Sequence, residues 1–262
     1  MTKKNIAKIV FCMCLLLVGA VFAQEVTNKA SKIELDKGPQ VKKTTLWEMI
    51  KQGGITMYPL GLFSVLTVYF VLQNGLALRE KVLLRPDLMP DFIKLMKEKK
   101  VKEAHDLCKE NNTLFTYVFA AGLERCSRGG EINFDKVKEA IEEASTEQIT
   151  TYMKPIDYLS IIGAVAPMLG LLGTVSGMIK AFKTIGATGM GKPELLATNI
   201  GEALVTTFTG LTIAIPAMLF YFYFRNNFIK TTATLGRNIG ALLDTLESGE
   251  LPLGFEDLGK KK

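Results

Sequence analysis

The sequence has 262 residues, of which 48% are hydrophobic and 22% are charged. Its positive mean hydropathy excludes an ordinary soluble domain, because so many charges are compatible with it only if apolar and charged residues are segregated along the chain. The net charge of +6 does not indicate a nucleic-acid-binding protein, since lysines and arginines are interleaved with acidic residues in the polar segments.

Residues 1–23 have the pattern of a signal peptide. Lysines precede a short apolar run at residues 9–20, and a small-residue cleavage site follows it. We expect cleavage before Gln24; an uncut signal anchor is the main alternative and gives the same topology downstream. Residues 24–54 begin polar and lysine-rich and predict a periplasmic N-terminal arm, with a short interfacial helix that starts at Thr45 with capping-box spacing.

Three uncharged stretches follow, at residues 52–78, 158–179 and 203–224. Each is longer than the about 20 helical residues that cross the hydrocarbon core of a bilayer. Helices are the natural form, because every backbone group then bonds within its own segment. We therefore predict an all-α membrane protein; the alternative is three buried helices of a soluble bundle. The expected transmembrane helices are residues 55–78, 156–182 and 195–224.

The segments between these helices are polar. Residues 79–155 show helical periodicity and predict a cytoplasmic helical domain between the first and second transmembrane helices. Residues 183–194 predict a glycine-rich periplasmic hairpin, and residues 225–262 predict a cytoplasmic tail. Positive charges at the two flanks of the first helix nearly balance, so the signal peptide decides the orientation. We expect a multi-pass protein of the bacterial inner (cytoplasmic) membrane with a periplasmic N-terminus.

The segment 79–155 contains two cysteines and the single histidine, but the sequence around them does not indicate a disulfide or an enzyme active site. Cys108 and Cys126 are expected in the reducing cytoplasm, so we predict no disulfide. His105, the single histidine, is expected at the surface. The sequence has no phosphate-binding loop and no metal-ligand cluster, which predicts a protein that is not an enzyme and needs no cofactor or metal. The two apolar faces expected here are Phe92, Leu95 and Met96, and Val137, Ala140, Ile141 and Ala144.

The second transmembrane helix has small residues along one face. Such a stripe lets helix backbones approach closely, so it predicts tight packing on other helices, within the chain or between copies. A glycine-rich helix without special packing is the alternative. The residues of this stripe are Gly163, Ala166, Gly170, Gly173, Gly177 and Ala181.

The third helix carries a polar face. Glu202, Thr206 and Thr209 share one side of the helix, whereas Thr207 points about 140° away from Glu202. On the second helix, Thr174 lies beside the small-residue stripe. Threonines in membrane helices often bond their own backbone, and Glu202 lies within about one turn of the membrane surface, so structural roles are the alternatives.

No carboxylate, histidine or lysine occupies the middle of a predicted transmembrane helix. Hydroxyl groups can line a water path, but they do not titrate near neutral pH. A proton relay built from this chain alone therefore lacks its carrier group, and a partner must supply it.

These segments carry motifs of a known family. The run from Ala166 to Ile179 resembles the second-helix motif of ExbB and TolQ. The runs 200–207, 210–211 and 214–217 are similar to the third-helix motif, and the start of the first helix at residues 53–64 looks like that of ExbB. The resemblance to the ExbB/TolQ/MotA proton-channel family, closest to its ExbB branch, covers about residues 47–227.

The resemblance implies a ring of five copies around a dimer of a single-span partner, ExbD, TolR or MotB, which brings an aspartate into the pore. It implies that the motor uses the proton-motive force to energise a TonB-like periplasmic protein. Thr174 and Thr207 match the family's pore threonines and Glu202 its pore glutamate; Thr206 is kept because the helical wheel favours it. Helix-packing roles are expected for Gly163, Gly170, Gly173, Gly177, Pro167 and Pro216.

Three points limit what the resemblance implies. Gln73-Asn74 stands where ExbB-like chains often have a Glu-Arg pair, which puts an ion pair at that end of the first helix in doubt. A TolQ-like role in envelope integrity and cell division is an alternative to the ExbB-like role, whereas a MotA-like protein would need a fourth membrane helix. A passive membrane scaffold is the alternative from outside the family.

Overall fold

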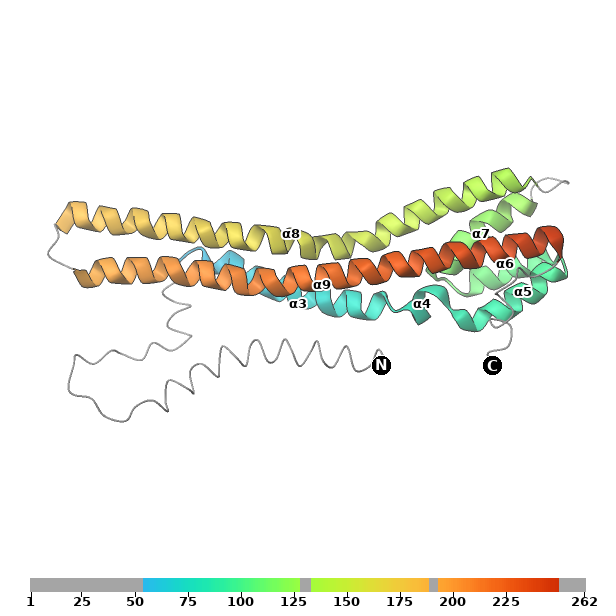
Figure 1. Ribbon diagram of the computed structural model, residues 1–262, viewed down its shortest axis with the longest axis horizontal. Helices are drawn as coiled ribbons and strands as arrows, with labels where there is room; N and C mark the ends of the chain where they lie inside the picture. The colour runs from blue at the N-terminus through green and yellow to red at the C-terminus, as the bar shows by residue number, and fades with distance from the viewer. Residues whose placement is uncertain (1–53, 128–132, 189–192, 250–262) are drawn as a thin grey trace, which may run out of the picture. The chain divides into compact units, whose positions relative to one another are not determined.

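The computed structural model in Figure 1 describes residues 54–127, 133–188 and 193–249. The chain divides into two units, Met1–Gly54 and Ile55–Lys262, and the described residues belong to the second unit except for Gly54. The predicted signal peptide, the arm up to residue 53 and the tip of the predicted hairpin lie outside the described residues.

The predicted all-α fold is confirmed for the described part of the chain, which contains helices and no strand. Three of the helices are long and apolar enough to cross a membrane, as predicted. The elements in chain order are α3 (Met57–Ala77), α4 (Glu80–Leu84), η1 (Pro86–Leu88), α5 (Met89–Lys97), α6 (Val101–Glu110), α7 (Leu114–Ser127), α8 (Phe134–Thr188) and α9 (Pro193–Ser248).

The second and third apolar stretches lie within much longer helices than the sequence predicts. Helix α8 has 55 residues and α9 has 56, so each is about 80 Å long, against a hydrocarbon core of about 30 Å. The amphipathic sequence on the polar side continues into the apolar stretch without a glycine break, so nothing ends the helix between them. Pro155, Pro167 and Pro216 lie inside these helices, where each removes one backbone hydrogen bond without ending the helix.

Helices α8 and α9 pack side by side, and α3 packs on both. The pairing is antiparallel: Gly163 of α8 lies against Met218 of α9, whereas Gly177, further along α8, lies against Ala203. A small apolar cluster joins the three helices through Met57, Leu60, Ala166 and Ala214. Large apolar side chains on the other faces are exposed, including Leu72, Leu171 and Phe208. Such surfaces need lipid or other protein to cover them.

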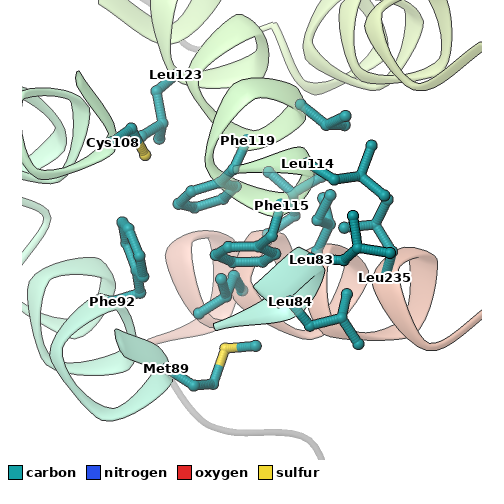
Figure 2. Packing of buried hydrophobic residues seen from close by; sticks show 14 of the residues in the cluster. Leu83, Leu84, Met89, Phe92, Cys108, Leu114, Phe115, Phe119, Leu123 and Leu235 are labelled. Atoms are coloured by element: carbon teal, nitrogen blue, oxygen red, sulfur yellow. The ribbon is translucent and has the colours of Figure 1, made fainter. Parts of the chain in front are cut away.

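The main hydrophobic core lies at the end of the long helices away from the α8–α9 connection, where Figure 1 shows α4 to α7. Figure 2 shows part of its packing. It contains residues of α4 to α7 packed on the start of α8 and the end of α9. Phe92 contacts Phe115 and Phe119 edge-on, with ring centroids 5.5 and 5.4 Å apart. The segment predicted as a helical domain therefore folds onto the extensions of the two membrane-spanning helices and has no separate core.

The cysteines of this core are free and buried. Burial raises the pKa of the Cys108 thiol to about 12, and burial also raises the pKa of Cys126. Both side chains therefore remain uncharged thiols at neutral pH and serve as small apolar core groups.

Asn74 of α3 is buried, with 2% of its surface exposed. Its side-chain Nδ2 donates a hydrogen bond of 3.1 Å to the carbonyl oxygen of Pro155 in α8. A neutral amide thus joins α3 and α8 at the position where ExbB-like chains often have a Glu-Arg pair. The polar group is satisfied without placing a charge in the helix contact.

The aromatic core generates a stability prediction. Phe119→Ala should lower the free energy of unfolding by about 3–5 kcal/mol, because the buried ring is lost and the rigid helices around it cannot close the cavity. Thermal unfolding of the detergent-solubilised protein measures this. Tyr117→Ala is the control: Tyr117 lies on the same helix and is 42% exposed, so its replacement should change stability by about 0.5 kcal/mol or less. Equal shifts for both variants would contradict the assigned core.

Candidate functional site

Helices α8 and α9 approach each other closely along the predicted glycine stripe. A Cβ atom added to Gly170 would lie 2.9 Å from the Cα atom of Thr207, and one added to Gly177 would lie 2.7 Å from the Cβ atom of Ala203. At Gly173, an added Cβ would overlap the side chain of Thr206. The stripe therefore packs on α9 of the same chain.

A glycine of α9 completes this contact. A Cβ atom added to Gly210 would lie 2.6 Å from the carbonyl oxygen of Ala166 and 3.3 Å from the Cα atom of Gly170. Gly210 belongs to the third-helix motif in the sequence, but no packing role was predicted for it. Its position in the antiparallel hairpin indicates the role, because Gly210 lies opposite Ala166 and Gly170 of the α8 stripe.

The prolines and the remaining glycine of the predicted packing set have weaker contacts. Gly163 faces the side chain of Met218, which is flexible enough to move. Pro167 and Pro216 are partly exposed within their helices.

Each threonine hydroxyl of the site donates to a backbone carbonyl. Thr207 Oγ1 donates across the hairpin to the Gly170 carbonyl oxygen at 3.0 Å. Thr206 Oγ1 donates to the Ala203 carbonyl oxygen at 2.7 Å, and it lies 3.4 Å from that of Gly170. Thr174 Oγ1 donates to the Leu171 carbonyl oxygen at 2.7 Å within α8. A hydroxyl that donates in this way still has lone pairs that can accept hydrogen bonds from water.

Burial separates these threonines into two kinds. Thr206 is 1% exposed and fills the contact between α8 and α9. Thr174 and Thr207 are half-buried, so their oxygen atoms lie at the edge of the helix pair. Thr174 is one turn along α8 from Gly170, whose carbonyl binds Thr207. Thr174 and Thr207 therefore lie within about one turn of each other along the hairpin, whereas Thr206 is buried between the two helices.

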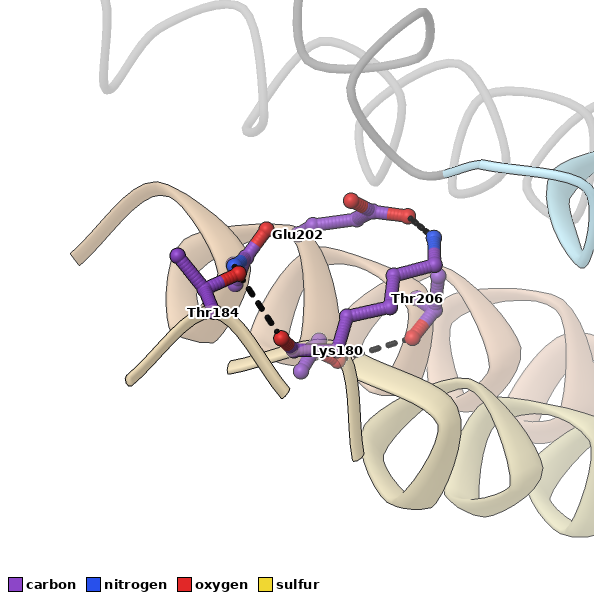
Figure 3. A network of polar contacts seen from close by, with 6 residues as sticks. Lys180, Thr184, Glu202 and Thr206 are labelled. Atoms are coloured by element: carbon purple, nitrogen blue, oxygen red, sulfur yellow. Dashed lines mark hydrogen bonds and ion pairs between the residues drawn. The ribbon is translucent and has the colours of Figure 1, made fainter. Parts of the chain in front are cut away.

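Glu202 forms an ion pair that the sequence analysis did not find. Its Oε1 atom is 2.7 Å from Nζ of Lys180 on α8 (Figure 3). Towards the α8–α9 connection, Nδ2 of Asn199 donates to Thr184 Oγ1 at 3.4 Å. The useful signal was again the register: the antiparallel contact of Gly177 with Ala203 brings position 180 opposite position 200, which is within one helical turn of Glu202.

The site contains hydroxyls and one ion pair, with no carboxylate, histidine or lysine in the apolar middle of the spans. The stretches 57–77, 158–179 and 203–224 have no charged residue and no histidine. Within the described ranges no three metal-ligating side chains come together. The arrangement can order water beside the helix pair and hold a charge at one end, but it has no nucleophile–base pair for covalent catalysis.

Three long apolar helices and a hydroxyl-bearing antiparallel hairpin define a multi-pass helical membrane protein. Residues 110–236 match the MotA/TolQ/ExbB proton channel family. Just under half of the chain therefore matches this family, whose description is that of a proton channel.

Named relatives support this match. The biopolymer transport protein ExbB of Xanthomonas campestris is 41% identical over 88 residues, which cover 34% of this chain and 35% of that protein. ExbB of Salmonella typhimurium is 40% identical over 96 residues, covering 37% and 39%. A putative ExbB-like protein of Synechocystis is 27% identical over 192 residues, covering 72% of this chain and 90% of the relative. The match thus spans about a third of the length of the more similar relatives.

Replacement by alanine should have opposite effects on stability at two glycines, Gly170 in the helix contact and Gly201 outside it. Gly170→Ala should destabilise the protein by about 1–3 kcal/mol, because the new methyl group meets the backbone of Thr207 and the two helices must separate. Gly201→Ala is the matched control, since a Cβ at Gly201 meets nothing within 4 Å and alanine favours a helix by about 1 kcal/mol. Thermal unfolding in detergent measures both. A Gly170→Ala variant as stable as Gly201→Ala would contradict this helix contact.

Proposed function

We propose that this chain is the ring-forming subunit of an ExbB-like proton channel in the bacterial inner membrane. In this proposal, the complex uses the proton-motive force to energise TonB-dependent transport across the outer membrane. The observation that carries the proposal is the α8–α9 hairpin: half-buried hydroxyls and a carboxylate lie on spans that have no titratable group in their middle. The match of residues 110–236 to a family described as a proton channel supports it.

The proposed path runs along the hairpin from its end near the α8–α9 connection into the span. Glu202 lies at the end near the α8–α9 connection, and Thr207 and Thr174 follow deeper in the span. Their oxygens can accept hydrogen bonds from water, which lets a chain of water molecules reach the membrane interior. Thr206 is buried between the helices, so we assign it to packing and place it outside the path.

A partner supplies the titrating group. We propose a dimer of a single-span ExbD- or TolR-like subunit whose aspartate enters the ring. A charged carboxylate in the middle of a bilayer costs about 2.5–3.5 kcal/mol on insertion scales, and protonation removes that charge. The neutral form can then move relative to the ring. The membrane potential contributes about 2.3 kcal/mol per charge per 100 mV to this cycle.

Copies of the chain meet through faces other than the glycine stripe, because the stripe is already covered within the chain. Exposed apolar side chains along α3, α8 and α9 offer such faces, with lipid covering the outside of the ring. We propose five copies, on the family resemblance. In the proposed topology, the predicted hairpin (residues 183–194) is periplasmic, and residues 79–155 and 225–262 are cytoplasmic.

Two other functions remain as candidates. A TolQ-like subunit would have the same site and would differ in the periplasmic protein that it drives. A passive scaffold would not need the hydroxyls or Glu202, so substitution at these positions separates it from a channel.

The topology is tested by cysteine labelling in intact cells. Gly189→Cys, near the α8–α9 connection, should react with a membrane-impermeant maleimide, whereas Ser248→Cys, at the other end of α9, should be protected. Permeabilised cells serve as the control and should label both positions. Labelling at position 248 together with protection at position 189 would reverse the orientation and remove the proposed function.

The mechanism is tested by uncoupler-sensitive uptake through an outer-membrane receptor in the native host. Thr174→Val and Glu202→Gln should each reduce uptake at least about ten-fold while the variant still copurifies with its single-span partner. Thr232→Val is the matched control: Thr232 makes the same kind of bond, to the carbonyl three residues earlier, but lies beyond the span. Wild-type uptake in both site variants would favour the scaffold.

A further inference from the structure

The ion pair of Lys180 and Glu202 joins the two helices of the proposed path at its mouth. Nζ of Lys180 lies 2.7 Å from Oε1 of Glu202, at the distance of a charge-assisted hydrogen bond. The Glu202 side chain is 18% exposed and the Lys180 side chain is 50% exposed. The carboxylate is thus held against the helix pair, whereas the lysine reaches it from the edge (Figure 3).

The close approach of the backbones fixes this geometry. Gly177 lies one turn before Lys180, and a Cβ added to it would be 3.1 Å from the Asn199 carbonyl oxygen. On the other side of the pair, Asn199 bonds Thr184. Contacts between α8 and α9 therefore lie on both sides of the ion pair along the helix axis. They fix the distance between the two helices at this point and so limit the positions that the carboxylate can take.

Few other charges face Glu202. On α8, Lys183 is three residues beyond Lys180 and is exposed. Helix α3 carries no charged side chain, and its tyrosines, Tyr58 and Tyr69, are exposed. Along α9, the charged residues nearest to Glu202 in the sequence are Glu194, two turns before it, and Arg225, at the far end of the span. Lys180 is therefore the cation in contact with Glu202 among the described residues.

An exposed ion pair contributes little, typically 0–1 kcal/mol, because water solvates both partners. A pair at the edge of a membrane differs, because removing one partner leaves the other charge beside a medium that solvates it poorly. The lysine side chain is the more exposed partner of this pair, and the glutamate side chain is the more covered one. This difference in exposure is expected if the role of the lysine is to hold the glutamate carboxylate in place.

We propose that Lys180 is a positioning residue for Glu202: its ammonium group holds the carboxylate at the mouth of the path and neutralises it between proton transfers. When a proton binds the carboxylate oxygen, the carboxylate becomes a neutral acid, and the ammonium keeps its own protons but loses its ionic partner. Loss of that proton to the water chain restores the pair. The inference rests on the proposed function, in which Glu202 belongs to the path.

The test compares three variants in the uncoupler-sensitive uptake assay, after copurification with the single-span partner. Lys180→Gln, which removes the cation, should reduce uptake about ten-fold or more. Lys180→Arg, which keeps it, should retain at least about half of the wild-type uptake. Lys183→Gln is the matched control and should match the wild type, because Lys183 has the same charge on the same helix and is not the cation in contact with Glu202. Full uptake in Lys180→Gln would overturn the inference.

The failure of the proposed function has a different signature. Glu202→Gln, measured in parallel, should lose uptake, and the double variant with Lys180→Gln should be no worse than Glu202→Gln alone. Wild-type uptake in Glu202→Gln would overturn the proposed path itself. Loss in Glu202→Gln with full uptake in Lys180→Gln would leave the path in place and remove only the role of Lys180.

A charge exchange covers the case in which Lys180→Gln fails to assemble. Lys180→Glu combined with Glu202→Lys restores an ion pair with the carboxylate on α8. Recovery of copurification without recovery of uptake would support a positioning role, because the carboxylate is then in the wrong place. Recovery of uptake, or failure to assemble, would overturn the inference, since the position of the carboxylate would not matter in the first case and the pair would not restore the site in the second.

Discussion

The close backbone contact between α8 and α9 determines most of what this structure can do. Glycines at positions 170, 173 and 177 let the α9 backbone and its small side chains approach α8 directly. Between apolar helices in a membrane there is little hydrophobic driving force, so close van der Waals packing and polar contacts hold them together. The Thr207–Gly170 hydrogen bond and the Glu202–Lys180 pair depend on this distance.

The same contact divides the threonines of α9 by role. At Gly173 the helices are so close that Thr206 becomes part of the packing, whereas Thr207 is turned to the edge and reaches the Gly170 carbonyl. A hydroxyl at the edge satisfies a backbone group and can still accept a hydrogen bond from water. Adjacent residues of one type can therefore carry packing and water contact separately.

The sequence predicted what depends on one helix at a time. The apolar spans, the α8 glycine stripe and the apolar faces at Phe92 and Val137 follow from length and periodicity, and each agrees with the structure. What it missed needs two helices in register: the Lys180 partner of Glu202 and the contact of Gly210 with Ala166. The helical wheel grouped Thr206 with Glu202, but it could not show that the neighbouring helix covers Thr206. The full length of α8 was not predicted, because the sequence changes from polar to apolar within this helix. Such a change does not end a helix, and no residue at that point does.

A span without a titratable group has a further consequence for how such a channel can work. A carboxylate fixed at mid-span in each copy of a ring would place several like charges close together in a medium of low dielectric constant, which is costly. Placing Glu202 at the end of the span, with a lysine in contact, leaves the apolar middle of the helix pair neutral. In the proposed complex, a partner that carries its own carboxylate along this hairpin meets hydroxyls and carbonyls, which solvate without competing for the proton. The chain would then provide a path of low charge, and the charge that moves in response to the membrane potential would belong to the partner.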